Sequence, residues 1–316
     1  MPPAPETGPD AAPERRPASV YPVLALGLAA FASSSILVRA AGDVPAASLL
    51  VWRAGLSVLL LLPLAARTVP AALWAMGRDE RGRLLLAGGL LALHFGTWIE
   101  SLSRTSVASA SVLVTTTPLF LAGFALVRRE RLGLPLGLAT LAGFGGAALI
   151  ALGDAGGDGA GGDSLVGNGL ALTAAFVFAL YMRVGARLRQ GLSWIAFVWP
   201  VYAIVAALAL GYALLTDAPV FTLSPRAYWF CLAMAVGPQI AGHGAFNYAL
   251  RYVPAVLLGL LTLLEPVGAS IAAFFLFDER PAGLALAGMA LTLGAVVLAL
   301  VAPRWSRGRI REPNTP

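Results

Sequence analysis

Three polar side chains recur at a helical spacing within one apolar stretch of the chain. Gln239, His243 and Asn247 stand four residues apart, so in a helix they share one face. Two amides and an imidazole can donate and accept several hydrogen bonds along such a face. We expect it to line a water-filled cavity that binds a polar molecule. The alternative is that the three side chains bond neighbouring helices and fix their packing.

A second apolar stretch carries His94 and Trp98, again one helical turn apart. An imidazole titrates near neutral pH, and an indole ring can stack on a ligand or cover its cation. We predict that both side chains line the same cavity. A structural histidine and a tryptophan that only fills space are the alternatives.

Arg53 lies well inside a third apolar stretch, about eight residues from its end. A guanidinium in this position can hold the carboxylate of a ligand through two parallel hydrogen bonds. It can equally form a structural ion pair with Glu100 or Glu265, because a buried charge needs a partner. The residue types favour the ion pair and leave the carboxylate site open.

Two prolines stand in the middle of apolar stretches, in the pairs Thr117-Pro118 and Glu265-Pro266. Proline lacks the N–H that a helix needs at this point and therefore bends it. The freed carbonyls, the threonine hydroxyls and the Glu265 carboxylate can line a path or contact an amino group, unless the bends serve packing alone. Glu265 is also our candidate for a proton-binding group.

A cluster of aromatic residues adds a third kind of chemistry. Trp199 and Tyr202 stand three residues apart within an apolar stretch, and we expect them to wall the cavity. Trp194 lies nearer to the end of that stretch and is typical of an aromatic anchor at a membrane interface.

The composition indicates what must position these groups. Of the 316 residues, 58% are hydrophobic and 12% are charged, and the mean hydropathy is +0.79. A soluble protein of this size needs more charge to cover its surface, so we predict an all-α integral membrane protein with the lipid bilayer as its solvent. All 22 basic residues are arginines, which excludes a P-loop and a pyridoxal Schiff base because both need lysine.

The same composition argues against cofactors, metals and nucleic acid as partners. Cys231 is the single cysteine and there are two histidines, which is too few for a conventional zinc site. The arginines lie in short loops and tails between apolar runs, where they indicate membrane topology rather than a nucleic-acid surface.

Ten apolar runs are long enough to cross a bilayer core of about 30 Å as helices. They lie near 20–40, 45–66, 84–103, 106–127, 133–152, 165–184, 192–215, 227–250, 254–277 and 282–302. With the N-terminus in the cytoplasm, 17 of the 22 arginines fall on the cytoplasmic side and four outside. This bias predicts ten transmembrane helices with the N- and C-termini both cytoplasmic.

The chain divides into two halves with tails and a linker. We expect a disordered cytoplasmic tail at 1–19, five-helix repeats at 20–152 and 165–302, a Gly/Asp-rich periplasmic linker at 153–164, and an Arg-rich cytoplasmic tail at 303–316. The spacing of the linker aspartates resembles a calcium loop, but its glycines favour a flexible joint.

An internal repeat supports the division. A shift of 149 residues places His94 on His243, Val107 on Val256, Glu130-Arg131 on Glu279-Arg280 and Gly145 on Gly294, and Pro118 meets Pro266 with a slip of one residue. Five spans per half is an odd number, so the second half must enter the bilayer in the opposite sense. Inverted repeats of this kind are typical of transporters whose site lies near the midplane, between the halves.

The motifs that carry this repeat also resemble a known family. Arg-Arg-Glu130-Arg and Phe-Asp-Glu279-Arg after the fourth span of each half, the two mid-span proline pairs, and the Gly/Ala-rich helices that follow resemble the EamA repeats of the drug/metabolite transporter superfamily. The resemblance covers about residues 20–302. It implies a ten-helix exporter of small metabolites in a bacterial inner membrane, most similar to the branch of amino-acid exporters related to the aromatic amino-acid exporter.

We therefore expect a secondary transporter, and not an enzyme, that exports amino acids by alternating access. The cargo would bind between the halves, near His94, Trp98, Gln239 and His243. The glycine-rich fifth and tenth spans are expected to pack within each half, and a homodimer contact through them stays open.

Three alternatives remain. Nucleosides or lipophilic cations are other candidate cargoes, and aromatic side chains beside Glu265 would suit a cation. Phosphorylated sugars fit less well, because Arg53 is the single arginine deep inside a predicted span rather than at its end. An intramembrane enzyme acting on pyrophosphates would need an aspartate-rich motif within a span, and the aspartates cluster in the linker instead.

Overall fold

The computed structural model describes residues 17–105, 107–128, 133–154, 163–277 and 283–301. Within these ranges the chain forms helices and no strand, which confirms the all-α prediction for the described residues. The elements are α1 (Val20–Ala32), α2 (Ser34–Ala40), α3 (Ala46–Ala75), α4 (Arg78–Arg104), α5 (Val107–Val114), α6 (Thr117–Val127), α7 (Leu134–Asp154), α8 (Asp163–Gly191), α9 (Trp194–Leu215), α10 (Pro225–Met234), the π-helix η1 (Ala235–His243), α11 (Gly244–Ala249), α12 (Ala255–Thr262), α13 (Leu264–Phe277) and α14 (Gly283–Val301).

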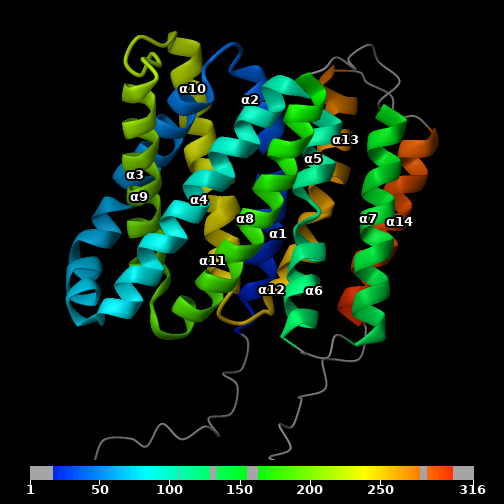
Figure 1. Cartoon of the computed structure of the whole chain (residues 1–316), viewed down its shortest axis with the longest axis horizontal. Coiled ribbons are helices and arrows are strands. Elements are labelled where there is room, and N and C mark those ends of the chain that lie inside the picture. The colour runs from blue at the N-terminus through cyan, green and yellow to red at the C-terminus, as the bar shows by residue number, and fades with distance from the viewer. Residues whose placement is uncertain (1–16, 106, 129–132, 155–162, 278–282, 302–316) are drawn as a thin grey trace, which may run out of the picture.

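The described elements line up as ten rods that correspond to the ten predicted spans (Figure 1). Six rods are single helices: α3, α4, α7, α8, α9 and α14. The other four are built from consecutive pieces: α1–α2, α5–α6, α10–η1–α11 and α12–α13. The sequence predicted these four spans without breaks, apart from the bends expected at Pro118 and Pro266.

α1 begins and α14 ends at the same end of the bundle, the lower end in Figure 1. We name this the terminal end, and the opposite one the far end. The first rod of the first half rises from the terminal end, whereas the first rod of the second half, α8, descends from the far end. The two halves therefore run through the bundle in opposite directions, as an odd number of rods per half requires.

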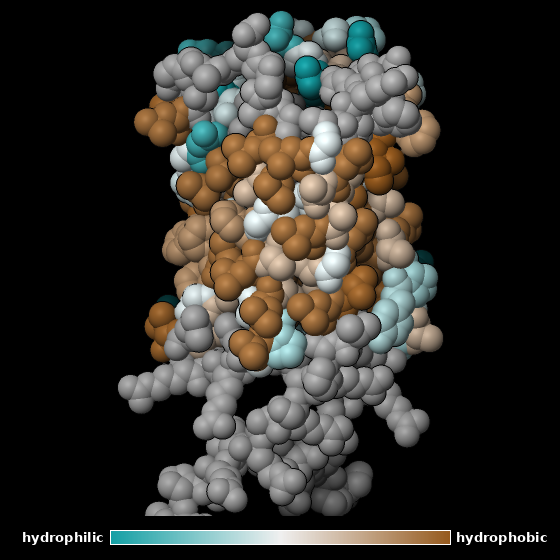
Figure 2. Space-filling view, turned by 90° about the vertical axis from the view of Figure 1, so that its right-hand side faces the viewer, coloured by the Kyte–Doolittle hydropathy of each residue, from teal (hydrophilic) through white to brown (hydrophobic). Residues whose placement is uncertain are grey.

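The outer surface of the bundle is apolar. Within the described part of the chain, five helical stretches are long and apolar enough to cross a membrane by length and composition: Val20–Ala40, Ala46–Ala75, Arg78–Arg104, Leu165–Gly191 and Trp194–Leu215. Large apolar side chains point outward, for example Leu138 and Leu141 on α7, which are 51% and 65% exposed. Figure 2 shows a broad brown band of apolar residues with hydrophilic residues toward both of its ends. A surface of this kind is suited to lipid, and the bundle is that of a multi-pass membrane protein.

Local sequence signals set where helices begin. The Ser193 side chain accepts a hydrogen bond from the Ala196 N–H at the start of α9. At the start of α10, Ser224 does the same for Ala227, and Pro225 occupies the first helical position, where its missing N–H costs nothing.

The packing of the rods is symmetric under exchange of the two halves. α3 packs along α9, and α7 packs along α14, so the second and fifth rods of each half meet their own counterparts. α4 packs on α8, and the equivalent rod η1–α11 packs on α1. Each of these contacts joins one half to the other, which is the arrangement that two inverted repeats around one pseudo-twofold axis produce.

Glycine allows the closest of these approaches. A Cβ atom at Gly146 of α7 would lie 2.7 Å from the Gly288 carbonyl oxygen of α14 and would also collide with Thr292. The expectation that the glycine-rich fifth and tenth spans pack within each half was therefore wrong. They pack on each other across the halves, because only a glycine backbone lets the two helix axes come this close.

Several predicted features lie outside the described residues. These are most of the N-terminal tail, Glu130, most of the 153–164 linker including Asp158, Glu279-Arg280, and the Arg-rich C-terminal tail.

Candidate functional site

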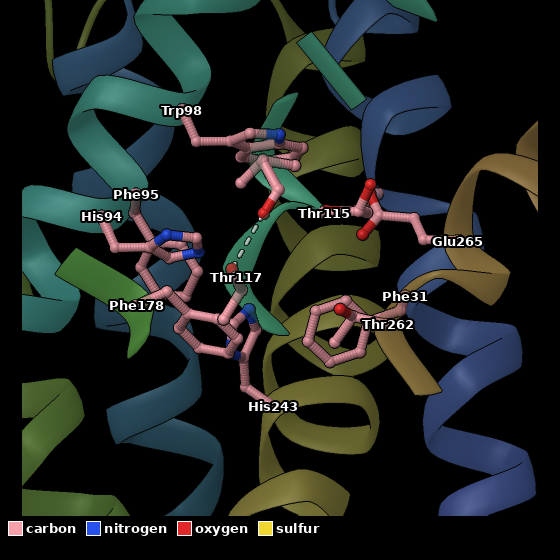
Figure 3. Close-up of a pocket in the computed structure, with 12 residues that line it drawn as sticks. Phe31, His94, Phe95, Trp98, Thr115, Thr117, Phe178, His243, Thr262 and Glu265 are labelled. Carbon is pink, nitrogen blue, oxygen red and sulfur yellow. Dashed lines mark hydrogen bonds between the residues drawn. The ribbon is translucent and has the colours of Figure 1, made fainter. Parts of the chain in front are cut away.

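The four interrupted rods meet α4 and α8 in the middle of the bundle, around a small cavity of about 30 Å³ (Figure 3). It is lined by Phe31, Ser34, His94, Phe95, Trp98, Val114, Thr115, Thr117, Phe178, His243, Thr262 and Glu265. These residues come from both halves of the chain. The volume holds roughly one or two water molecules, so the cavity must widen to admit a larger molecule.

Proline creates the interruption between α5 and α6. Pro118 has no N–H to give to the carbonyl of Val114, and the hydroxyl of Thr117 donates to that oxygen instead, at 2.9 Å. Thr115 donates to the Val112 carbonyl in the same way, at 2.8 Å. The threonines therefore stabilise the break, and their hydroxyl oxygens remain as acceptors at the cavity wall.

The break between α12 and α13 is the counterpart in the second half. It falls at Leu263, three residues before Pro266, and the Thr262 hydroxyl donates to the Gly259 carbonyl at 2.6 Å. α13 then begins at the cavity with Glu265 in its first turn. Matching prolines thus produce matching breaks, one in each half, at the wall of one cavity.

A third rod is interrupted by the π-helix η1. Pro238 stands inside it and cannot bond the preceding turn, so the helix widens over Ala235–His243. The widened turns place Gln239 and His243 in the interior of the bundle, where both are buried. The sequence predicted a regular helix here, although the pair Gly237-Pro238 was a visible signal of an irregularity.

Two histidines face each other at the centre, each packed on a phenylalanine from the other half. The His94 ring stacks on Phe178 with centroids 4.5 Å apart, and the His243 ring lies 4.5 Å from that of Phe31. The two imidazole centroids are 6.0 Å apart. The repeat that placed His94 on His243 in sequence thus brings them together in space, as an equivalent pair across the pseudo-twofold axis.

A backbone contact determines the tautomer of His94. Its Nδ1 lies 3.0 Å from the carbonyl oxygen of Ala174, which can only accept, so Nδ1 carries the proton. In the neutral ring, Nε2 is then an acceptor.

Glu265 lies on the other side of the cavity from His94, next to Thr115 (Figure 3). Its side chain is 6% exposed, and within the described residues it forms no ion pair. Trp98 covers the cavity from α4 and is also buried. A carboxylate surrounded by aromatic rings is an arrangement that binds an organic cation, since both the charge and the ring faces attract it.

Arg53 forms a second polar cluster behind the cavity wall. Its Nε donates to the Gln239 side-chain oxygen at 2.6 Å, and the Tyr202 hydroxyl donates to the Gln239 carbonyl at 2.7 Å. The guanidinium lies 4.1 Å from the centre of the Phe95 ring, and that ring lines the cavity. Arg53 therefore lies behind Phe95, and neither it nor its bonded neighbours Gln239 and Tyr202 line the cavity.

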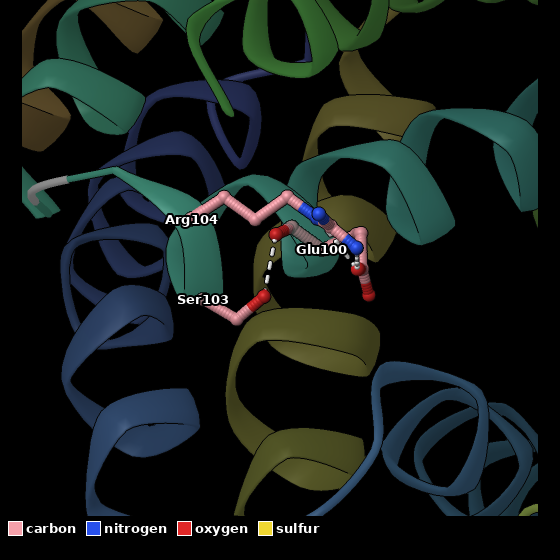
Figure 4. Close-up of polar contacts among 3 residues, drawn as sticks. All are labelled: Glu100, Ser103 and Arg104. Carbon is pink, nitrogen blue, oxygen red and sulfur yellow. Dashed lines mark hydrogen bonds and ion pairs between the residues drawn. The ribbon is translucent and has the colours of Figure 1, made fainter. Parts of the chain in front are cut away.

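The ion pair expected for Arg53 is not formed among the described residues. Glu100 instead binds Arg104 one turn away on α4, with a closest N–O distance of 2.8 Å (Figure 4). Both side chains lie near the far end of the helix and are about 40% exposed. Helical spacing brings this pair together locally.

Two predicted site residues lie elsewhere. Asn247 accepts a hydrogen bond from the Tyr181 hydroxyl at 2.7 Å and is not part of the cavity wall. Trp199 donates to the Val58 carbonyl at 3.0 Å and lines a separate, mainly apolar groove between α3, α4 and α9. A spacing of three residues places Trp199 about 60° away from Tyr202 around the helix, enough to turn it toward α3.

Sequence reasoning missed the phenylalanines Phe31, Phe95 and Phe178. Nothing local distinguishes a phenylalanine at a cavity from one that faces lipid or fills the core.

The far end of the bundle opens into a larger space. A vestibule of about 660 Å³ lies between α2, α3 and α4, and its lining includes Arg39, Asp43 and Leu102. Ser35 and Ile99 line this vestibule, and their chain neighbours Ser34 and Trp98 line the central cavity. Both spaces therefore use the same stretches of α2 and α4.

The equivalent place at the terminal end is closed. Arg189, near the end of α8, is 2% exposed and donates to the carbonyls of Asn247 and Leu192, the former at 2.8 Å. Trp194 donates to the Gly244 carbonyl at 2.8 Å. These bonds join the loop between α8 and α9 to α11, whereas the corresponding loop at the far end borders the open vestibule.

Comparison with known proteins agrees with this architecture. A model of the EamA-like transporter family matches residues 19–152 and, a second time, residues 165–301. Among solved structures, 29 chains match. One, described only as a crystal structure of a protein, aligns with a TM-score of 0.75 over 89% of this chain and 96% of its own, at 18% identity, and so supports the fold alone. No curated protein matches.

The two family matches coincide with the two oppositely directed sets of five rods, and together they cover most of the sequence. The chain belongs to the EamA-like transporter family and is a multi-pass membrane transporter of the drug/metabolite superfamily.

Proposed function

We propose that this transporter exports amino acids across a bacterial inner membrane by alternating access. The observation that carries the proposal is the Glu265 carboxylate in an aromatic-walled cavity midway between the two halves. The carboxylate would attract the ammonium group of an amino acid, while Phe31, Phe178 and Trp98 would contact an apolar side chain.

The arginine bias supports one orientation of the bundle in the membrane. The terminal end carries the connections that are rich in arginine, and the positive-inside rule assigns that end to the cytoplasm. Cargo would enter through the end that Arg189 closes and leave through the vestibule at the far end. The pseudo-twofold axis supports such a cycle, because exchanging the two halves produces a second conformation that is open at the opposite end.

A lipophilic cation is a second candidate cargo. The same features favour it, since Glu265 would neutralise the charge and the aromatic rings would cover an apolar body. Unlike an amino acid, a lipophilic cation has no carboxylate, so it would need no positively charged group in the site.

The test is transport by the purified chain in liposomes. Vesicles loaded with one unlabelled compound at a time should take up the labelled form by counterflow, using the natural amino acids, nucleosides and a panel of cationic drugs. Saturable counterflow of at least one amino acid is expected. If no amino acid is carried while a nucleoside or a drug is, the cargo assignment is wrong. Empty vesicles and vesicles with heat-denatured protein serve as controls.

A further inference from the structure

Arg53 is a buried cation that forms no salt bridge among the described residues. Its side chain is 0% exposed, and the ion pair formed within that part of the chain joins Arg104 and Glu100 instead. Of its three nitrogens only Nε has a partner, the Gln239 amide oxygen; Nη1 and Nη2 are buried and bond nothing. A buried charge in this condition is costly, and it is expected at a site that an anion completes.

The surroundings of Arg53 offer further donors. Gln239 is 0% exposed, and its Nε2 is also buried without a partner. Its side-chain oxygen is used by Arg53, and its backbone oxygen is used by Tyr202. The cluster therefore presents unused N–H groups of a guanidinium and of an amide. A planar group with two negatively charged oxygens, such as a carboxylate, matches the fork of the guanidinium.

Phe95 lies between the cavity and the guanidinium of Arg53. One face of its ring covers the guanidinium, at 4.1 Å from Cζ, and the ring also lies edge-on to His243, with centroids 4.6 Å apart. Because Phe95 lines the cavity and Arg53 does not, a molecule in the cavity meets the phenylalanine first. The cation–π contact partly stabilises the buried guanidinium of Arg53 while no anion is bound.

We propose that Arg53 and Gln239 form a carboxylate-binding subsite covered by Phe95, and that the carboxylate of the cargo displaces the ring as the cavity widens. The inference rests on the proposed function and narrows it. Glu265 takes the ammonium group on one side and Arg53 takes the carboxylate on the other. The cargo is then a zwitterion, and a lipophilic cation fills only half of the site.

The test compares phenylalanine with phenethylamine, the same molecule without its carboxylate, in counterflow by the full chain. The Arg53→Gln variant should raise the KM for phenylalanine at least tenfold while the flux of phenethylamine is kept. Phe95→Leu should lower the KM for phenylalanine, because the carboxylate no longer competes with the ring. Arg67→Gln, the same change at an exposed position of the same helix, should alter neither. An equal loss of both substrates in Arg53→Gln, or no loss, would overturn the proposal.

A second measurement keeps the two hypotheses apart. If wild-type protein carries no amino acid, the proposed function fails, and the subsite is tested by thermal stabilisation with benzoate, acetate and inorganic phosphate. Stabilisation by the carboxylates that disappears in Arg53→Gln supports the subsite. Stabilisation by phosphate alone, or by none of the three, refutes it. Because Arg53→Gln can also fail to fold, Phe95→Leu is measured in parallel, and it should bind benzoate more tightly than wild type.

Discussion

Some residues occupy equivalent positions in the two halves of this protein. At some of these positions the residue type is the same, and at others it differs. His94 and His243 occupy equivalent places, and each is packed on a phenylalanine of the other half. The 149-residue shift that pairs the histidines also pairs Arg53 with Tyr202, and both of these bond Gln239. The two halves thus contribute equivalent positions to the central site, but one of these positions holds a cation and the other a phenol.

Glu265 offers the most direct test at this scale. Replacing it by glutamine keeps the size of the side chain and removes the charge that would bind an ammonium group. Loss of one charge-assisted hydrogen bond, about 1.5–3 kcal/mol, should raise the KM for an amino acid roughly 10- to 100-fold. Counterflow in liposomes measures the change.

The control is Glu100→Gln, the same substitution at the exposed pair with Arg104. It should leave the KM unaltered. A Glu265→Gln protein with wild-type KM for every carried compound would remove Glu265 from the site.

Spacing could identify the faces of helices but not what lies opposite them. His94, Trp98, His243 and Glu265 line the cavity as expected from their types and positions. Asn247 shares the interior with Gln239 and His243, yet it meets Tyr181 because α8 packs against α11 at that level. The neighbour of a buried polar group depends on chain segments more than 60 residues away, and periodicity contains no information about them.

At the scale of elements, breaks within the helical rods shape the site. Pro118 and Pro266 produce the two matching breaks, and Pro238 accompanies the π-helix. The prolines were visible in the sequence, and their bends were predicted. A complete separation into half-helices was not, because it also requires that Thr117 and neighbouring packing satisfy the freed carbonyl groups.

Close packing between the elements makes Gly146 a sensitive position. A Cβ at Gly146 would lie 2.7 Å from the Gly288 carbonyl oxygen, so Gly146→Ala should force α7 and α14 apart. Overpacking of this kind costs about 1–3 kcal/mol and should lower the apparent Tm in detergent.

The adjacent Gly145→Ala is the matched control. There the added methyl would meet only Leu291, at an ordinary 3.8 Å, and the Tm should stay near that of wild type or rise slightly. Equal Tm values for the two variants would contradict the contact between α7 and α14.

At the scale of the whole molecule, the two ends differ. The far end contains a vestibule of about 660 Å³, while Arg189 closes the equivalent place at the terminal end. Arg39 stands near the end of the first rod of the first half, as Arg189 does in the second, and it is exposed at the vestibule. In the conformation open at the terminal end, pseudo-symmetry predicts that Arg39 is buried and closes the far end, as Arg189 closes the terminal end here.

Arg189→Met should therefore shift the molecule toward that second conformation. The change removes two charge-assisted hydrogen bonds, about 1.5–3 kcal/mol each, that only the present conformation contains, so the populations should move by about tenfold or more. The readout is the modification rate of a cysteine placed at Leu102 in the vestibule, in a Cys231→Ser background. This rate should fall.

Arg187→Met, at an exposed position of the same turn, is the control and should leave the rate of labelling unchanged. A labelling rate for Arg189→Met equal to that of the control would mean that Arg189 does not hold the terminal end closed.

The sequence by itself determined the membrane class, the ten rods, the opposite directions of the two halves and the types of residue at the site. All of these follow from local hydropathy, from a repeat and from the parity of the spans, which are properties that a chain carries before it folds. Only the tertiary structure decided that Phe95 separates Arg53 from the cavity, that Glu100 binds Arg104, and that one end is open while the other is closed. These outcomes depend on contacts between distant helices, whose energies differ by a few kcal/mol between competing arrangements that the same pattern allows.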